Sequence, residues 1–234
     1  MKKIYLGIQA TYNTTDIALF EDENCLEQFF RADLKASSHL IPYLDSLLRN
    51  NGKTLSDLAF IALDKGPGAF TTLRVTIATL NGIAFAHKIP LIGIDGLEAL
   101  TYEQLYTLTA PQKNFPITIA SLLNAYSNDV YFMISEINNG FATQIDYGCK
   151  NIDIVLESLA SRASEQKIFF TGNGALLHQE RISTKFTRCE ITPTSTANAK
   201  TIAHLGLSNF IEHKNCVDKI LPNYVKTQLF NIKK

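Results

Sequence analysis

The sequence has no tryptophan, only four cysteines and no excess of charge of either sign. The cysteines stand singly, without a C-x-x-C pair or zinc-site spacing, which argues against a disulfide framework or a structural zinc. Lys+Arg and Asp+Glu both number 22, so no overall positive field would draw the chain to nucleic acid or an anionic membrane. This cysteine usage favours the reducing cytoplasm.

Long apolar runs are also missing. The longest mostly apolar stretch, residues 75–86, contains Asn81 and is shorter than the roughly 20 residues that a membrane span needs. The opening MKKIYLGIQA begins like a signal peptide, but Gln9, Thr11 and Asn13 interrupt it and no small-residue cleavage site follows. With 46% hydrophobic residues in 234, the chain still has ample material for a core. We therefore expect a cytoplasmic protein without membrane contact.

The first half of the chain alternates strand and helix signals. Three consecutive strand patterns, KIYLGI, DIALF and CLEQFF, predict an antiparallel meander. Next come the helix pattern HLIPYLDSLL, the strand AFIAL, a helix ending near residue 87, the strand LIGI and a helix over about residues 95–108. This order predicts a mixed sheet with helices packed against it.

A second set of elements follows the linker-like stretch APQKNFP. It consists of the strands ITIASLL, DVYFMISEI and FATQIDYG, a helix near residues 151–161, the strand KIFFTG and a long helix near residues 195–214. We therefore expect two lobes that weakly repeat one unit. Residues 1–109 form the N-terminal lobe with the GPG loop and interface helices, and residues 110–234 form a divergent C-terminal lobe. The last helix is a candidate for packing back on the first lobe.

The stretch DKGPGAFTTLR joins an apolar strand to a helix, a layout that leaves free N–H groups where an anion can bind. It has neither the Gly-Lys-Ser/Thr of a Walker A loop nor the G-x-G-x-x-G spacing of a dinucleotide site. An ordinary strand-to-helix turn is the favoured alternative. The candidate anion-loop residues are Gly66, Pro67, Gly68, Phe70, Thr71 and Arg74.

The helix after this loop carries a stripe of small residues. Ala78, Gly82 and Ala86 are four positions apart, with Val75 at the start of the stripe, so they share one helix face. Glycine inside a helix costs about 1 kcal/mol relative to alanine, and close approach of another backbone would explain it. That backbone belongs either to the protein's own sheet or first helix, or to a partner's helix.

The segment GPGAFTTLRVTIATLNGIAFAHKIPLIGIDGLEAL resembles the signature of the TsaB (YeaZ) family, which reads G-P-G-S-F-T-G-L-R, a helix of small residues, then I-P-L-x-G-V-x-x-L-E-A-L. A looser similarity extends to the first strand and to SSHLIPYLDSLL, and faint echoes remain in LNAYSNDVYF and LPNYVK. The resemblance implies a two-lobed, actin-like and ribonuclease-H-like α/β fold of the acetate and sugar kinase, chaperone and actin superfamily.

The resemblance also implies a function. Members of this family serve as non-catalytic subunits of the bacterial machinery that installs threonylcarbamoyl on the adenosine next to the tRNA anticodon. The expected partners are a TsaD-like catalytic paralogue, which the subunit stabilises, a TsaE-like ATPase, whose recruitment it supports, and a second copy when the chain is alone. Contact with tRNA is expected only indirectly. The expected interface residues are His39, Leu40, Tyr43, Leu44, Leu47, Val75, Ala78, Gly82 and Ala86.

Positions that would carry catalysis hold unsuitable residues. Kinases and ATPases of the superfamily place an aspartate at the end of the first strand to hold Mg²⁺, and the matching residue here is Gln9. Two metal-binding histidines of the catalytic paralogue are matched by Gly96 and Leu100. The five histidines show no metal-site spacing. We therefore expect no catalytic residue, metal or cofactor; a small ATPase or phosphotransferase of the same fold is the alternative.

Further departures from the family pattern affect the loop. Ala69 replaces a serine that could cap the helix, and Thr72 replaces a glycine. In the second lobe, Asn124 and Tyr126 stand where aspartate and arginine are expected. These changes argue against nucleotide or anion contact, so we interpret the loop as a tight turn that starts an interface helix.

Overall fold

The computed structural model describes residues 2–32, 36–108, 117–163 and 166–226. The chain divides into unit 1, Met1–Thr107 with Thr196–Pro222, and unit 2, Leu108–Ser195 with Asn223–Lys234. The boundary expected from sequence, between residues 109 and 110, lies outside the described residues. Residues 196–222, which include the last helix, group with unit 1 instead of the second lobe.

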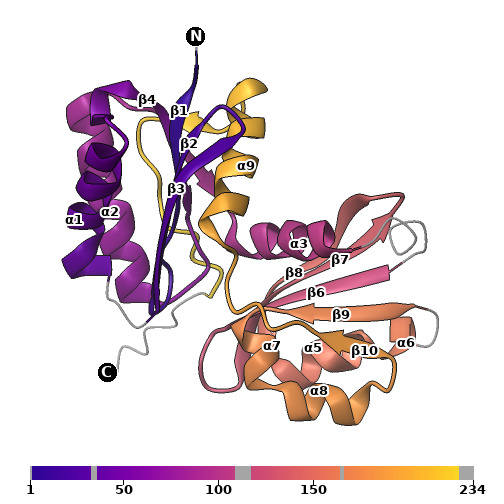
Figure 1. The fold of residues 1–234 in the computed structure, drawn as a ribbon. Coiled ribbons are helices and arrows are strands. Elements are labelled where there is room, and N and C mark those ends of the chain that lie inside the picture. Colours follow the sequence, from indigo (N-terminus) through magenta and orange to yellow (C-terminus); the bar gives the residue numbers. More distant parts are fainter. Residues whose placement is uncertain (1, 33–35, 109–116, 164–165, 227–234) are drawn as a thin grey trace, which may run out of the picture. The chain divides into compact units, whose positions relative to one another are not determined.

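Unit 1 contains a mixed six-stranded sheet (Figure 1). Its strands are β1 (Ile4–Gln9), β2 (Thr14–Glu21), β3 (Asn24–Ala32), β4 (Leu58–Asp64), β5 (Leu91–Ile94) and β11 (Cys216–Val217). Their order is β11-β5-β4-β1-β2-β3, with β3 at one edge. β1, β4 and β5 run parallel, whereas β1, β2 and β3 form the antiparallel meander that the sequence predicted.

Helices cover both faces of this sheet. They are α1 (Ala36–Asn50), the short η1 (Leu55–Asp57), α2 (Phe70–His87), α3 (Gly96–Thr107) and α9 (Ala199–Ile211). Figure 1 shows α1 and α2 side by side against one face and α9 against the other. Leucines of α1 and the buried side of α2 form one apolar core with the strands. No helix among the described residues has the length and hydropathy to cross a membrane.

Helix α9 lies very close to the sheet because two glycines leave room for it. A Cβ atom added at Gly206 of α9 would come within 3.0 Å of the Ala62 Cβ on β4. A Cβ atom added at Gly7 of β1 would collide with the backbone oxygen of Ala199 and the Cβ of Ala203. Close helix–sheet packing therefore requires glycine at both positions.

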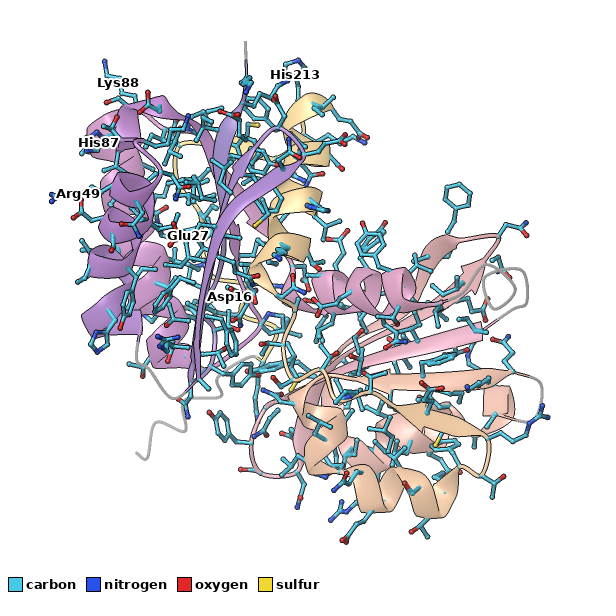
Figure 2. The ribbon with its side chains drawn as sticks, viewed as in Figure 1. Asp16, Glu27, Arg49, His87, Lys88 and His213 are labelled. Atoms are coloured by element: carbon cyan, nitrogen blue, oxygen red, sulfur yellow. The ribbon has the colours of Figure 1, made fainter. Side chains whose placement is uncertain are left out.

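Two carboxylates, the buried Asp16 and the half-buried Glu103, hold the first turn of α9. The N–H of Ala199 donates to Asp16 Oδ2 at 2.8 Å, and the N–H of Asn198 donates to Glu103 Oε2 at 2.7 Å. Negative charge at a helix start is favourable. Desolvation by burial nevertheless outweighs these hydrogen bonds and raises the pKa of both carboxyl groups above their ordinary values. Figure 2 shows Asp16 at this junction of β2 and α9.

Unit 2 repeats the topology of unit 1. Its strands are β6 (Ile117–Asn124), β7 (Asp129–Asn138), β8 (Phe141–Asn151), β9 (Lys167–Thr171) and β10 (Cys189–Ile191). The order β10-β9-β6-β7-β8 and the strand directions match those of β5-β4-β1-β2-β3. The helices are α5 (Ile152–Ser158), α6 (Ala160–Ala163), α7 (Asn173–Leu177) and α8 (Gln179–Lys185). The predicted α/β class and the repeated unit are confirmed.

Candidate functional site

The small residues of α2 face away from the protein's own core. Ala78, Gly82 and Ala86 are exposed, and Val75 is half-buried. A Cβ atom added at Gly82 would meet no other heavy atom within 4 Å. The alternative that this stripe packs against the protein's own sheet or first helix is therefore excluded.

Phe85 lies on the same side of α2, three positions after Gly82, and is 86% exposed. Val75, Ala78, Gly82, Phe85 and Ala86 are called the α2 face from here on. It places a large aromatic side chain next to a strip of minimal side chains, so one helix face offers both a projecting ring and a strip that another backbone can approach closely. Phe85 was missed from sequence because only the small residues of this helix were considered.

The leucines of α1 do not belong to a partner surface. Leu40, Leu44 and Leu47 are buried in the core of unit 1. Their assignment to the partner interface is therefore corrected. Their helical spacing reflects packing of α1 on the sheet and on α2, which is the usual cause of such a pattern.

His39 and Tyr43 lie on the side of α1 that faces β3. The ring of Tyr43 stacks on Phe29 of β3 with ring centroids 3.7 Å apart, and His39 stacks on Tyr43 at 5.7 Å. Both are half-buried. The residues expected to form one interface thus separate into the α2 face and a stack beside β3.

The Gly66–Gly68 loop is a turn whose donors are used within the protein. The N–H of Gly66 donates to Asp64 Oδ1 at 2.7 Å, and the N–H of Ala69 donates to the Thr11 carbonyl at 2.9 Å. The Gly66 carbonyl accepts from the N–H of Gly96. Gly66 has φ 98°, and its peptide bond to Pro67 is cis. Two N–H groups that an anion would use are therefore already taken.

The other candidate loop residues lie at the start of α2. Phe70, Thr71 and Arg74 are exposed, and the Arg74 guanidinium lies 4.9 Å from the centroid of the Phe70 ring. Ala69, the N-cap residue, provides no side-chain hydrogen bond to the helix. The aromatic contact orients Arg74 on the surface of α2.

Asp64 is a buried carboxyl group behind this loop that was not singled out from sequence. Its residue is 3% exposed, and desolvation raises its pKa to about 7, against the hydrogen bonds from Gly66 and Thr11. The nearby Asp95 carboxylate contributes to this raised pKa. A Cβ atom at Gly96 would lie 2.8 Å from Asp64 Oδ1, so this glycine makes room for the carboxyl group. An anion at this loop would lie close to the Asp64 carboxyl group, and this arrangement disfavours anion binding.

Gln9 occupies the end of β1 as part of a hydrogen-bond network that reaches the Asp64 carboxyl group through Thr11. Its Nε2 donates to Thr11 Oγ1 at 2.9 Å, and Thr14 Oγ1 donates to its Oε1 at 3.0 Å. The side chain is buried, so its amide oxygen is not available to an external ion. Within the described ranges, no three His, Cys, Asp or Glu side chains gather closely enough to hold a metal ion.

The two divergent residues of unit 2 shape a turn. Asn124 Oδ1 accepts from the N–H of Tyr126 at 2.8 Å, and the N–H of Asn124 donates to Asn173 Oδ1 at 2.8 Å. Tyr126 has a positive φ of 62° and an exposed ring. Hydrogen bonds from backbone N–H groups to the side-chain oxygens of Asn124 and Asn173 therefore hold the start of the β6–β7 connection.

A cavity of about 340 Å³ lies where α1 and α2 end, lined in part by Arg49, Lys53 and His87. Figure 2 shows Arg49, His87 and Lys88 at this end of unit 1. Arg49 pairs with Asp45 at 3.1 Å. Cations near helix C-termini interact favourably with the last carbonyls. Stabilisation of the helix ends therefore accounts for these basic side chains, and no bound ligand is needed to explain them.

Comparison with known proteins gives consistent matches. The family model described as TsaD, tRNA N6-adenosine threonylcarbamoyltransferase, matches residues 31–219. The tRNA threonylcarbamoyladenosine biosynthesis protein TsaB of Bacillus subtilis is 26% identical over 180 residues, which cover 76% of this chain and 74% of that protein. A tRNA N6-adenosine threonylcarbamoyltransferase of Solidesulfovibrio magneticus is 36% identical over 110 residues, 40% of this chain and 30% of that protein.

A solved structure shows the same fold. YeaZ from Pseudomonas aeruginosa superposes with a TM-score of 0.75 at 20% identity, covering 95% of this chain and 99% of that one. The family model spans more than half of the chain, and the resemblance seen in residues 66–100 agrees with it. The chain therefore belongs to the family that the tRNA N6-adenosine threonylcarbamoyltransferase model describes, as a member of its TsaB (YeaZ) group.

Proposed function

We propose that this chain is a non-catalytic interaction subunit of bacterial tRNA threonylcarbamoyladenosine biosynthesis, acting in the cytoplasm. It binds and stabilises a TsaD-like catalytic paralogue, supports recruitment of a TsaE-like ATPase and forms a homodimer when alone. The proposal is supported by the biosynthetic role for which the Bacillus subtilis relative is named and by the family model. Because the formal net charge is zero, we assign tRNA contact to the partner.

The exposed α2 face is the observation that carries this proposal. Gly82 has open space above it, and Phe85 projects beside it. A paralogue that shares this fold presents an equivalent helix, so two such helices can approach closely along their small residues. Aromatic residues, phenylalanine included, are enriched at the cores of protein interfaces.

The network around Gln9 argues against the ATPase alternative. Mg²⁺ is held by charged oxygen ligands in phosphoryl-transfer sites, whereas Gln9 is neutral and its amide already pairs with Thr11 and Thr14. The isolated chain should therefore hydrolyse no ATP above a buffer blank and show no heat of Mg-ATP binding in titration calorimetry. Turnover above the blank that disappears in Gln9→Ala would contradict this expectation.

Gly82→Leu should weaken binding of the TsaD-like paralogue about five- to hundredfold. A leucine would occupy the space through which the partner's helix is expected to approach the backbone at Gly82, and overpacking of this kind costs about 1 to 3 kcal/mol. The monomer should remain folded, because no atom lies within 4 Å of the added Cβ. Titration of the purified paralogue from the same organism by calorimetry or interferometry measures the effect.

The matched control is Ser183→Leu, which adds the same side chain at an exposed position of α8 in unit 2. It should leave paralogue binding unchanged. Phe85→Ala tests the aromatic anchor and should weaken binding by at least tenfold. If Gly82→Leu and Phe85→Ala both bind the paralogue as the parent chain does, the α2 face is not the interface.

A further inference from the structure

A second pocket of unit 1 lies where β5 meets β11 and the segment that follows it. Its volume is about 200 Å³. The residues that line it are Lys65, Gly93, Asn215, Val217, Lys219, Ile220 and Leu221. Every other residue from 215 to 219 lines the pocket, so Asp218 does not. Among the described residues that line it, two are lysines and none is acidic.

Lys65 is held beside β5 through its backbone and its aliphatic stem. Its N–H donates to the Ile94 carbonyl at 2.9 Å. A Cβ atom added at Gly93 would lie 3.0 Å from Lys65 Cδ and 3.4 Å from Ile220 Cδ1. Glycine at position 93 therefore allows the stem of Lys65 to lie close to the strand, and the residue is half-buried. A lysine packed in this way buries its stem and keeps its ammonium group in contact with solvent.

The wall formed by the segment after β11 is fixed by Asn81 of α2. Asn81 Nδ2 donates to the Ile220 carbonyl, and the N–H of Ile220 donates to Asn81 Oδ1, both at 2.9 Å. The side chain of Ile220 is buried in the core of unit 1. Lys219 and Leu221, on either side of Ile220, are exposed. Contacts within the protein therefore hold both walls in place, which lowers the entropy cost of binding a ligand between them.

The polar side chains of this pocket are not used elsewhere in the described part of the chain. The ammonium groups of Lys65 and Lys219 form no salt bridge or hydrogen bond there, and the Asn215 amide forms no hydrogen bond. Burial raises the pKa of Glu98, and the Lys65 charge offsets this effect only in part. Lys65 is therefore not neutralised by a close contact with that carboxyl group. Two cations without a close counter-charge at one pocket favour an anionic ligand.

We propose that this pocket binds a phosphate dianion, either free phosphate or the terminal phosphate of a small phosphomonoester. A terminal phosphate carries about −1.5 to −2 charges at neutral pH and three acceptor oxygens. Two ammonium groups and one amide offer matching charge and hydrogen-bond donors. Lysine binds phosphate as a point charge, so the site does not need the planar fork of an arginine. An internal phosphodiester of RNA carries one charge only and is the poorer match.

This site goes beyond the proposed function, which concerns partner proteins. None of the lining residues belongs to the α2 face. The test uses the full chain alone, without the paralogue. Failure of one assignment therefore leaves the other standing.

Titration calorimetry at constant ionic strength, with inorganic phosphate and with glycerol phosphate, should show saturable binding, whereas glycerol should not bind. Lys65→Gln and Lys219→Gln should each weaken binding about tenfold or more, because each removes one charge-assisted hydrogen bond. Lys219→Arg keeps the charge and should retain most of the affinity. The matched control is Arg188→Gln, which removes one positive charge from an exposed position of unit 2 and should have no effect.

The two probes also separate the two sources of the phosphate group. Binding of inorganic phosphate alone would identify free phosphate as the ligand, and binding of glycerol phosphate would identify a phosphomonoester. Either result supports the proposal if it depends on both lysines. Both glutamine variants should unfold at the same urea concentration as the parent chain, because neither lysine forms an ion pair within the described residues.

A further measurement does not depend on any substitution. Phosphate should shift the amide NMR signals of Gly93 and of residues 215–221 and leave those of unit 2 in place. The proposal is overturned if neither probe binds, if both glutamine variants bind as the parent chain does, or if Arg188→Gln weakens binding as much as they do. Displacement of phosphate by an RNA oligonucleotide without terminal phosphates would also overturn it.

Discussion

Gly206→Ala should destabilise unit 1 by about 2 to 4 kcal/mol, although alanine is the better helix former. The added Cβ atom would fall within 3.0 Å of Ala62 Cβ and 3.3 Å from Phe60 Cε2, both on β4. Neither neighbour is the flexible end of a long side chain, so α9 as a whole must move away from the sheet. Overpacking of a tight core typically costs about 1 to 3 kcal/mol, and a helix shift adds lost contacts.

Gly82→Ala is the matched control, because Gly82 also lies inside a helix of unit 1. With nothing within 4 Å of the new Cβ, only the helix preference remains, and the variant should gain about 0.5 to 1 kcal/mol. Urea unfolding followed by circular dichroism compares the two free energies of unfolding with the parent chain. If Gly206→Ala and Gly82→Ala changed the free energy of unfolding in the same direction, α9 would not approach β4 as described.

These two glycines also show where sequence reasoning stops. Gly82 lies four positions from both Ala78 and Ala86, and Gly206 lies three positions after Ala203, so each glycine shares a helix face with alanine and looks like a close-packing site. The structure leaves the first open to solvent and closes the second against Ala62. Periodicity gives the helix and the face, whereas the element that covers the face depends on tertiary packing.

The helices and strands show the same contrast between what periodicity predicts and what tertiary packing decides. Long strands and helices are predictable because alternation and helical spacing extend over many residues, as in the β1–β2–β3 meander and α2. Among the described residues, the elements missed from sequence include η1, α7, α8, β10 and β11, which have two to seven residues. β11 shows why: the segment after it is fixed by hydrogen bonds between Asn81 and the backbone of Ile220, 139 positions apart.

The candidate site was predictable only in part. The small residues of the α2 face were named from sequence, but Leu40, Leu44 and Leu47 share their helical spacing and are core residues. Asp64 was overlooked because an aspartate after an apolar strand is usually a solvated turn residue. Its burial arises from Gly96, a residue distant in sequence that allows the chain to close over the carboxyl group.

Asp64→Asn should raise the stability of unit 1 by about 2 to 4 kcal/mol at pH 8 and have little effect at pH 4. Burial raises the pKa of Asp64 from 3.8 to about 7, and each tenfold increase in proton affinity corresponds to about 1.4 kcal/mol. The folded state therefore holds this proton more tightly than the unfolded state. Its contribution to stability is fully present below pH 4 and is lost as pH rises to about 7.

Asparagine is close in shape to aspartate and keeps an oxygen for the Gly66 N–H, while its amide faces Thr11 in place of the second carboxylate oxygen. Because it carries no charge at any pH, the variant should lack the decline in stability between pH 4 and 7. Urea unfolding of both chains at closely spaced pH values measures the difference between their free energies of unfolding. That difference should grow through this interval and then level off.

Asp57→Asn supplies a control with the opposite sign. Asp57 is exposed, and hydrogen bonds from the Thr54 hydroxyl and N–H lower the pKa of its carboxyl group below the ordinary value. Its stabilising contribution is therefore present above pH 4 and is lost as pH falls, so its removal should lower stability at pH 8 and not at pH 2. If Asp64→Asn behaved like Asp57→Asn, Asp64 would be ionised and well solvated, and the closed turn described around Gly66 and Gly96 would be wrong.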